Sequence, residues 1–164
     1  MNKLNPEKEF DIKEATSEDM KHIYGFIRKL AIYEKAEKEV LISEEQLIND
    51  GFNEPKRFES LMCFVEGEPA GMCLFYHRYS TWKGLSFYLE DIYIDDRFRR
   101  MGIASAFMKI LCQIALDRKC GRFEWQVLDW NQSAIDFYKT MGAELDPEWI
   151  NGKMTPEKMK EWLS

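Results

Sequence analysis

A basic turn near the middle of the chain has the composition of an anion-binding site. The segment from Arg99 to Ser105 (RRMGIAS) places two arginines ahead of Gly102 and Ala104, where an amphipathic pattern begins. The first backbone N–H groups of a helix have no partner within the helix and lie at the positive end of its dipole. Small side chains there let a phosphate approach the backbone. The segment predicts a phosphate site, although an ordinary basic helix start is an equally good interpretation on physical grounds alone.

Two consecutive carboxylates precede this turn. Glu90 and Asp91 lie within an aromatic and β-branched run, Ser86 to Ile94, that predicts a central strand. Successive side chains of a strand point to opposite faces, so we expect only one of the two to face a site. A carboxylate there can attract a cationic ligand. The other interpretation is an exposed carboxylate on an edge strand.

The elements that would position these residues form an α/β pattern. Apolar residues at helical spacing predict helices ending near residue 33, from 43 to 51 and from 103 to 116. Strands are expected at residues 10–12, 61–65, 70–76, 86–94 and 123–128. Two further helices are expected, at residues 132–141, closed by Gly142, and after Pro156. The order β-α-α-β-β-β-α-β-α predicts a mixed α/β domain, with antiparallel strands first and a βαβ unit later.

Composition limits the class of protein. The chain has 164 residues, with 23 Lys and Arg against 29 Asp and Glu, so its formal net charge is −6. This length predicts a single domain spanning residues 1–164. The acidic balance argues against nucleic acid or an anionic membrane as a partner, because both attract basic proteins. We expect a cytoplasmic protein without a signal peptide or membrane span, without a metal site, and with its four cysteines as reduced, buried core thiols.

Two motifs together resemble a known enzyme superfamily. The run Arg99-x-x-Gly102-x-Ala104 matches the acetyl-CoA signature Arg/Gln-x-x-Gly-x-Gly/Ala of the GNAT superfamily of acyl-CoA N-acetyltransferases, and it follows a strand and opens a helix. The stretch from Asn131 to Ala143 is similar to a second block of the same superfamily. The resemblance implies the GNAT fold, a central mixed, mostly antiparallel sheet flanked by helices. It also implies acetyl-CoA as the co-substrate.

Four further segments narrow the resemblance. Residues 30–34, 50–52, 79–84 and 88–91 (YLED) are similar to the diamine (spermidine/spermine) N-acetyltransferases, and thialysine N-acetyltransferases share much of this pattern. The resemblance implies transfer of an acetyl group to a primary amine of a small di- or polyamine, by direct attack of the amine on the thioester. It also implies a homodimer. The chain departs from the diamine pattern after Ala143, where a short polar tail with Trp149 replaces a longer aromatic strand.

The resemblance also assigns roles to residues. Tyr138 takes the position of the general acid, and Glu90 is expected to bind the amine and take its proton, directly or through water. The cofactor is expected to contact Ile92, Tyr93, Ile94, Arg99, Arg100, Met101, Gly102, Ile103, Ala104, Ser105, Asn131, Ser133 and Ala134. The substrate wall is expected to comprise Tyr33, Glu34, Trp82, Glu90, Asp91, Glu124, Trp125 and Gln126. Without the motif, Tyr138 would be a helix-face aromatic, and Asn131 would be a helix N-cap.

Other functions remain open at this point. The acceptor could be thialysine, another amino acid or an aminoglycoside rather than a polyamine. A protein N-terminus or a lysine side chain would need an open peptide groove, which the loop from Tyr79 to Leu85 could close. A non-catalytic module that binds acyl-CoA and reports its level to a partner would not need Tyr138 or Glu90, so their presence favours an enzyme.

Overall fold

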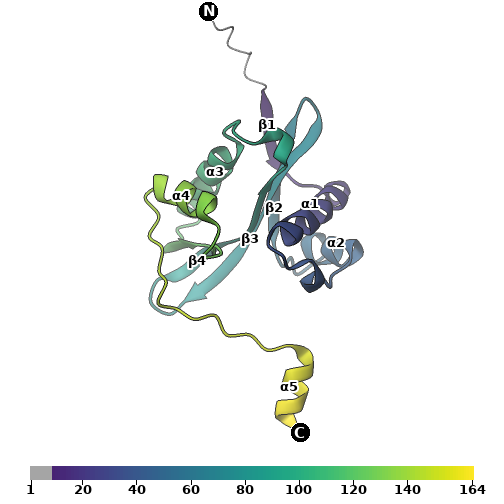
Figure 1. The fold of residues 1–164 in the computed structure, drawn as a ribbon, viewed down its shortest axis with the longest axis vertical. Helices are drawn as coiled ribbons and strands as arrows, with labels where there is room; N and C mark the ends of the chain where they lie inside the picture. The colour runs from purple at the N-terminus through teal and green to yellow at the C-terminus, as the bar shows by residue number, and fades with distance from the viewer. Residues whose placement is uncertain (1–8) are drawn as a thin grey trace, which may run out of the picture. The chain divides into compact units, whose positions relative to one another are not determined.

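A five-stranded sheet forms the centre of the first of two compact units, Met1–Gln126 and Val127–Ser164, in a computed structural model that describes residues 9–164 (Figure 1). The strands lie in chain order: β1 (Phe10–Glu14), β2 (Glu59–Val65), β3 (Glu68–Ser80), β4 (Gly84–Ile94) and β5 (Arg122–Glu124). Strands β1 to β4 pair antiparallel, and β5 pairs parallel to β4. This confirms the mixed, mostly antiparallel sheet predicted from the sequence.

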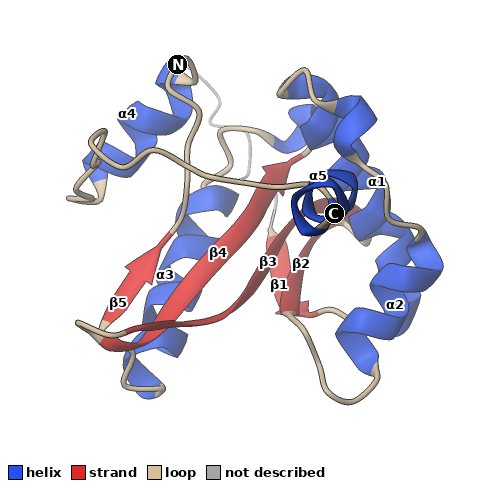
Figure 2. Ribbon diagram, turned by 90° about the horizontal axis from the view of Figure 1, so that it is seen from below, coloured by secondary structure: helices blue, strands red, loops and turns tan. Residues whose placement is uncertain are grey.

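Helices cover both faces of this sheet. Helices α1 (Met20–Tyr33) and α2 (Glu44–Phe52) lie on one face, and α3 (Ile103–Asp117) lies on the other (Figures 1 and 2). The face toward α1 and α2 has its own apolar cluster, because every second residue of β3 and the matching residues of β4 point there. The buried members of this cluster are Met20, Ile23, Phe26, Leu47, Met62, Met72, Leu74 and Tyr93.

Local signals account for the helix starts. Thr16 and Asp19 form the predicted capping pair ahead of α1, with the Thr16 backbone N–H donating to Asp19 Oδ2 at 2.8 Å. A one-turn 3-10 helix, η1 (Ser17–Asp19), lies between this cap and α1. Ser43 caps α2 by accepting a hydrogen bond from the Gln46 backbone N–H.

The second unit contains two short helices. Helix α4 (Gln132–Thr140) is followed by Gly142 at φ +78°, the left-handed conformation predicted for a glycine that ends a helix. Helix α5 (Pro156–Leu163) begins with Pro156 at its first position and Thr155 as its cap. Both helices were expected from the sequence. None of the helices among residues 9–164 is long and apolar enough to cross a membrane.

Two expectations from the sequence were wrong, one about a strand end and one about the burial of the cysteines. β5 ends at Glu124 instead of extending to residue 128, because among residues 9–164 it pairs only with Ser86–Tyr88 of β4, directly before a bulge in that strand. Bulges break the ladder and increase the twist, which carries the neighbouring strands apart. The four cysteines are not all buried. Cys63 and Cys73 are, but Cys112 is exposed and Cys120 is partly exposed.

Candidate active site

A β-bulge places Glu90 outside the regular ladder. Leu89 pairs with Phe75 and Asp91 pairs with Leu74, so Glu90 is one extra residue without a backbone pairing partner on β3. Two residues on the bulged strand then oppose one on its neighbour, and the alternation of faces is interrupted. This local irregularity decides where the two carboxylates point.

Both carboxylates lie toward the face covered by α1 and α2. The Tyr76 hydroxyl donates a 2.7 Å hydrogen bond to Glu90 Oε2, and Tyr76 packs against the apolar cluster of that face. Asp91 is opposite Leu74, a buried member of the same cluster. The expectation that Glu90 and Asp91 point to opposite faces was therefore wrong, because strict alternation holds only for an unbulged strand.

Three carboxylates on this face form an acidic cluster, which we define as Glu34, Glu90 and Asp91. Burial, together with the negative charges of Glu90 and Glu34, raises the pKa of Asp91 to about 7. Burial also raises the pKa of Glu34, which directly follows α1. A cation that binds beside carboxylates with raised pKa values is held favourably, because it stabilises their charged forms. Such a cluster has the chemistry to bind an ammonium group.

Glu124 of β5 borders this cluster through Tyr88. The two residues are cross-strand neighbours, and the pKa of Tyr88 is raised first by burial and then by Glu90, with smaller contributions from Glu124 and Asp91. Arg122 Nε lies 3.0 Å from Glu124 Oε2, an ion-pair distance. The same oxygen has no hydrogen bond of acceptable geometry among the described residues.

The turn between β4 and α3 has the backbone of an anion site. Arg100 and Gly102 both adopt left-handed conformations, at φ 63° and 81°, on either side of Met101. Gly102 is the N-cap of α3 and supplies no capping side chain, and the first helical bond runs from the Ala106 N–H to the Gly102 carbonyl. The N–H groups of Ile103, Ala104 and Ser105 belong to the turn that such a start leaves unsatisfied. A concave run of N–H groups at a helix start suits a phosphate.

One edge of β4 is available next to this turn. Ile92, Tyr93 and Ile94 pair with β3 on one side, and the pairing with β5 on the other side stops at Tyr88. Among the described residues, no strand pairs with that second edge beyond Tyr88. Backbone groups on such an edge can pair with an extended ligand as they would with a strand. The three residues predicted to contact an acyl carrier therefore lie where such pairing is possible.

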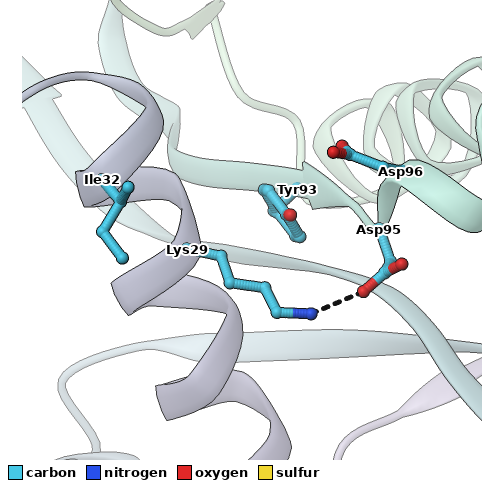
Figure 3. Close-up of a pocket in the computed structure, with 5 residues that line it drawn as sticks. All are labelled: Lys29, Ile32, Tyr93, Asp95 and Asp96. Carbon is cyan, nitrogen blue, oxygen red and sulfur yellow. Dashed lines mark hydrogen bonds and ion pairs between the residues drawn. The ribbon is translucent and has the colours of Figure 1, made fainter.

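A cleft of about 260 Å³ lies between α1 and the end of β4 (Figure 3). Lys29 reaches across it from α1 and donates a 2.6 Å hydrogen bond to Asp95. Arg97 also donates to Asp95, at 3.0 Å. Burial disfavours the charged form of Asp95, but the two cations together outweigh this effect and lower its pKa to about 2. This ion-pair group fixes the end of β4 against α1, on the side where Tyr93 packs on Phe26 with ring centroids 5.4 Å apart.

Arg99 links the turn to the end of α1. It forms a 2.7 Å ion pair with Asp96, and its guanidinium lies 6.0 Å from the ring centroid of Tyr33. Arg100 is exposed. The predicted cofactor turn and the predicted substrate residues Tyr33 and Glu34 therefore approach each other at one end of the sheet.

Three predicted substrate residues do not join the acidic cluster. Trp82 is 79% exposed in the turn between β3 and β4, roughly 20 Å along the strand from Glu90 at about 3.3 Å per residue. Trp125 packs against Phe123 with ring centroids 5.0 Å apart, and Phe123 packs on Phe87, on the opposite side of β5 from Glu124. Gln126 is exposed beyond the end of β5. Their contact with a substrate stays a prediction.

The remaining predicted residues belong to the second unit. Tyr138 is buried on α4, with its ring centroid 5.4 Å from that of Phe137. Asn131 is the N-cap of this helix and accepts a 3.3 Å hydrogen bond from the Ala134 backbone N–H, while Ser133 lies exposed in the first turn. The helix-cap interpretation of Asn131 is confirmed. The roles of these four residues in catalysis and cofactor binding stay predictions.

Sequence reasoning missed Tyr76 and Tyr88, which contribute to the surroundings of the carboxylates. Their rings lie 5.3 Å apart as cross-strand neighbours, and burial followed by the Glu90 hydrogen bond raises the pKa of Tyr76. The alternation of residues 72, 74 and 76 in β3 was a usable signal for the face of Tyr76. The pairing of Tyr76 with β4 could not be predicted, because that register depends on the bulge.

Comparison with known proteins identifies the class. The family model described as "Acetyltransferase (GNAT) family" matches residues 18–143, and solved structures share the fold. An integron cassette protein from V. cholerae superposes with a TM-score of 0.76 at 22% identity, over 94% of this chain and 97% of that one. An aminoglycoside N-acetyltransferase in complex with CoA gives a TM-score of 0.73 at 16% identity, over 92% and 99% of the two chains. The chain therefore belongs to the acetyltransferase (GNAT) family.

Relatives of known name share more of the sequence. Thialysine N-epsilon-acetyltransferase of Sus scrofa is 43% identical over 161 residues, covering 92% of this chain and 95% of the relative. The Caenorhabditis elegans protein of the same name is 41% identical over 134 residues, covering 82% of each. Spermidine/spermine N(1)-acetyltransferase-like protein 1 of Homo sapiens is 30% identical over 141 residues, covering 82% of this chain and 20% of that protein. These similarities confirm the two family resemblances seen in the sequence.

Proposed function

We propose that the protein transfers an acetyl group from acetyl-CoA to the primary amine of a small cationic acceptor. The observation that carries this proposal is the position of the acidic cluster on β4, the strand that leads directly into the anion-binding turn of α3. The carboxylates of residues 90 and 91 suit an ammonium group, and the turn a few residues after them suits a phosphate-bearing carrier. The edge of β4 between them has no strand partner beyond Tyr88 among the described residues.

Acetyl-CoA fits the residues that the chain offers. The backbone from Ile103 to Ser105, with the left-handed Arg100 and Gly102, would hold the pyrophosphate, and Arg99 and Arg100 would add positive charge. The β4 edge at residues 92–94 would pair with the pantetheine arm. When bound, acetyl-CoA supplies a thioester carbonyl for an amine to attack.

The catalytic roles follow from the acid–base needs of the reaction. The acceptor must lose a proton before it can act as a nucleophile, and Glu90 is proposed to hold the ammonium group and to take that proton directly or through water. Tyr76 fixes the Glu90 carboxylate by its 2.7 Å hydrogen bond. Tyr138, the residue at the general-acid position of the family motif, is proposed to protonate the departing sulfur. The active enzyme is proposed to be a homodimer.

An amino acid with a side-chain amine is the preferred acceptor. Thialysine N-epsilon-acetyltransferases match the chain at 38–44% identity, whereas the spermidine/spermine-like relative matches at 30%. A di- or polyamine remains the second candidate, because the acidic cluster accepts any small polycation. This ranking replaces the diamine preference drawn from the sequence segments.

Release of free thiol from acetyl-CoA tests the proposal. Purified protein is assayed with L-thialysine, putrescine, spermidine, spermine and a lysine-containing peptide. Turnover with thialysine above the others supports the amino-acid acceptor, and turnover with spermidine or spermine above thialysine selects the second candidate. Tight CoA binding without turnover on any amine would refute the enzyme and favour a binding module. Light scattering of the same sample tests the dimer.

A further inference from the structure

Arg78 on β3 places a positive charge beside the acidic cluster. The residue is exposed, and its guanidinium carbon lies 4.7 Å from the ring centroid of Tyr88. Within residues 9–164 it forms no ion pair and donates no hydrogen bond. Most of the other arginines of the first unit pair with carboxylates, as Arg118 does with Glu59. Arg78 therefore retains its full set of donors for a ligand.

The neighbours of Arg78 are the residues that border the acceptor site. Arg78 and Tyr76 are two positions apart on one strand, so both point to the face that carries Glu90 and Asp91. The negative charge of Glu90 raises the pKa of both Tyr76 and Tyr88, and the positive charge of Arg78 lowers it. The site thus has a row of carboxylates with one guanidinium at its end.

A guanidinium in this place disfavours one class of acceptor and suits another. A polyamine carries only positive charges, so a fixed cation at the end of its groove would weaken its binding. An amino acid with a side-chain amine carries a carboxylate as well. The planar fork of arginine binds a carboxylate through two parallel hydrogen bonds, and stacking on an aromatic ring orients that fork in advance.

We propose that Arg78 binds the α-carboxylate of an amino-acid acceptor while Glu90 and Asp91 hold its side-chain amine. This assignment rests on the proposed acetyltransferase function and makes Arg78 the residue that selects amino acids over diamines. The spacing agrees with it. Arg78 lies two residues beyond Tyr76, the partner of Glu90, which is about 6.6 Å along the strand. That separation is comparable with the extended side chain of lysine, ornithine or thialysine.

Pairs of acceptors that differ only in the α-carboxylate isolate its contribution to kcat and KM. Lysine and cadaverine, like ornithine and putrescine, differ only in this group. The measurement is kcat and KM for each acceptor with acetyl-CoA in the wild-type protein, Arg78→Gln, Arg78→Lys and the control Arg57→Gln, an exposed arginine before β2. Arg78→Gln is expected to lower kcat/KM for the amino acids by roughly ten- to a hundredfold through KM, with diamine values unchanged or higher. Arg78→Lys should restore part of the loss, and Arg57→Gln should resemble the wild type.

The outcomes separate this inference from the function on which it rests. If the wild-type protein acetylates no amine, the proposed function fails. If it acetylates amines but Arg78→Gln leaves the ratio between amino acid and diamine unchanged, the function stands and the role of Arg78 is wrong. An equal loss for both acceptors would show that Arg78 acts by supporting Tyr88, and a wild-type preference for diamines would also overturn the assignment. Thermal melting of each variant identifies any that fails to fold.

Discussion

The buried carboxylate of Asp91 should make the protein less stable as the pH rises. Its pKa lies at about 7 in the folded chain, against an ordinary value of 3.8. Between about pH 4 and pH 7 the folded state therefore keeps a proton that the unfolded state has lost, so folding stability falls as the pH rises through this range. Above pH 7 the loss is complete. Each tenfold change in the ionisation equilibrium corresponds to about 1.4 kcal/mol, which puts the loss at about 4 kcal/mol at most.

Asp91→Asn tests this reasoning, since an amide of the same shape carries no charge at any of these pH values. The free energy of unfolding in urea is measured for the variant and the wild-type protein at pH 5 and pH 8.5. The variant should gain about 2–4 kcal/mol relative to the wild type between the two conditions. Taking the difference between the proteins cancels the titration of the other carboxylates. Asp117→Asn, which removes an exposed carboxylate at the end of α3, controls for the loss of one negative charge.

The same substitution should damage acceptor binding. An ammonium group gains from the ionised form of Asp91, so Asp91→Asn is expected to raise KM for a cationic amine about tenfold while it stabilises the free protein. Parallel pH profiles for the variant and the wild type would refute the burial argument. A more stable variant with an unchanged KM would refute the placement of the amine beside Asp91.

Three further perturbations address other parts of the site. Tyr138→Phe should lower kcat by roughly a hundredfold with little change in KM, and near-normal turnover in a thiol-release assay would remove its role as the acid. Gly102→Ala should cost about 1–2 kcal/mol and raise KM for acetyl-CoA, because a Cβ is strained at φ 81°; calorimetric titration with CoA checks it. Asp95→Asn should cost about 2 kcal/mol at pH 7, and the cost should shrink as the pH falls from about 4 toward 2, where the wild-type carboxylate is itself protonated. Urea unfolding at pH 7 and pH 3 measures that difference, and an equal cost at both would contradict the ion-pair argument for Lys29 and Arg97.

Local patterns were enough to predict the turn and the helix start at residues 99–105. The helix from Ile103 is amphipathic over its whole length, and the small residues at its start lie within six positions of the arginines. The fold class followed from the order of elements, since each long helix and most strands carry their own periodicity. Contacts across the sheet played no part in these predictions.

The arrangement of the proposed acceptor side could not be predicted from single segments, because it depends on contacts between strands. Glu90 and Asp91 share a face because β3 and β4 change register between Leu74 and Phe75, and no pattern within residues 84–94 alone indicates this. The early end of β5 has the same origin. Tyr76 and Arg78 became visible only once the register had placed them opposite the carboxylates. Bulges are set by pairing with a neighbour, so single-strand alternation predicts the wrong face beyond them.

The extra residue in β4 divides this strand into two segments with different registers relative to β3. Up to Leu89 the residues pair with β3 in one register, and from Asp91 onward they pair in a register shifted by one residue. Without Glu90 the two registers would merge, and every other β3–β4 pair could stay as it is. The backbone ladder between β3 and β4 thus has no requirement for a residue at this position. Glu90 is therefore an insertion that the strand pairing does not need. Its proposed contact with the acceptor amine would explain its presence.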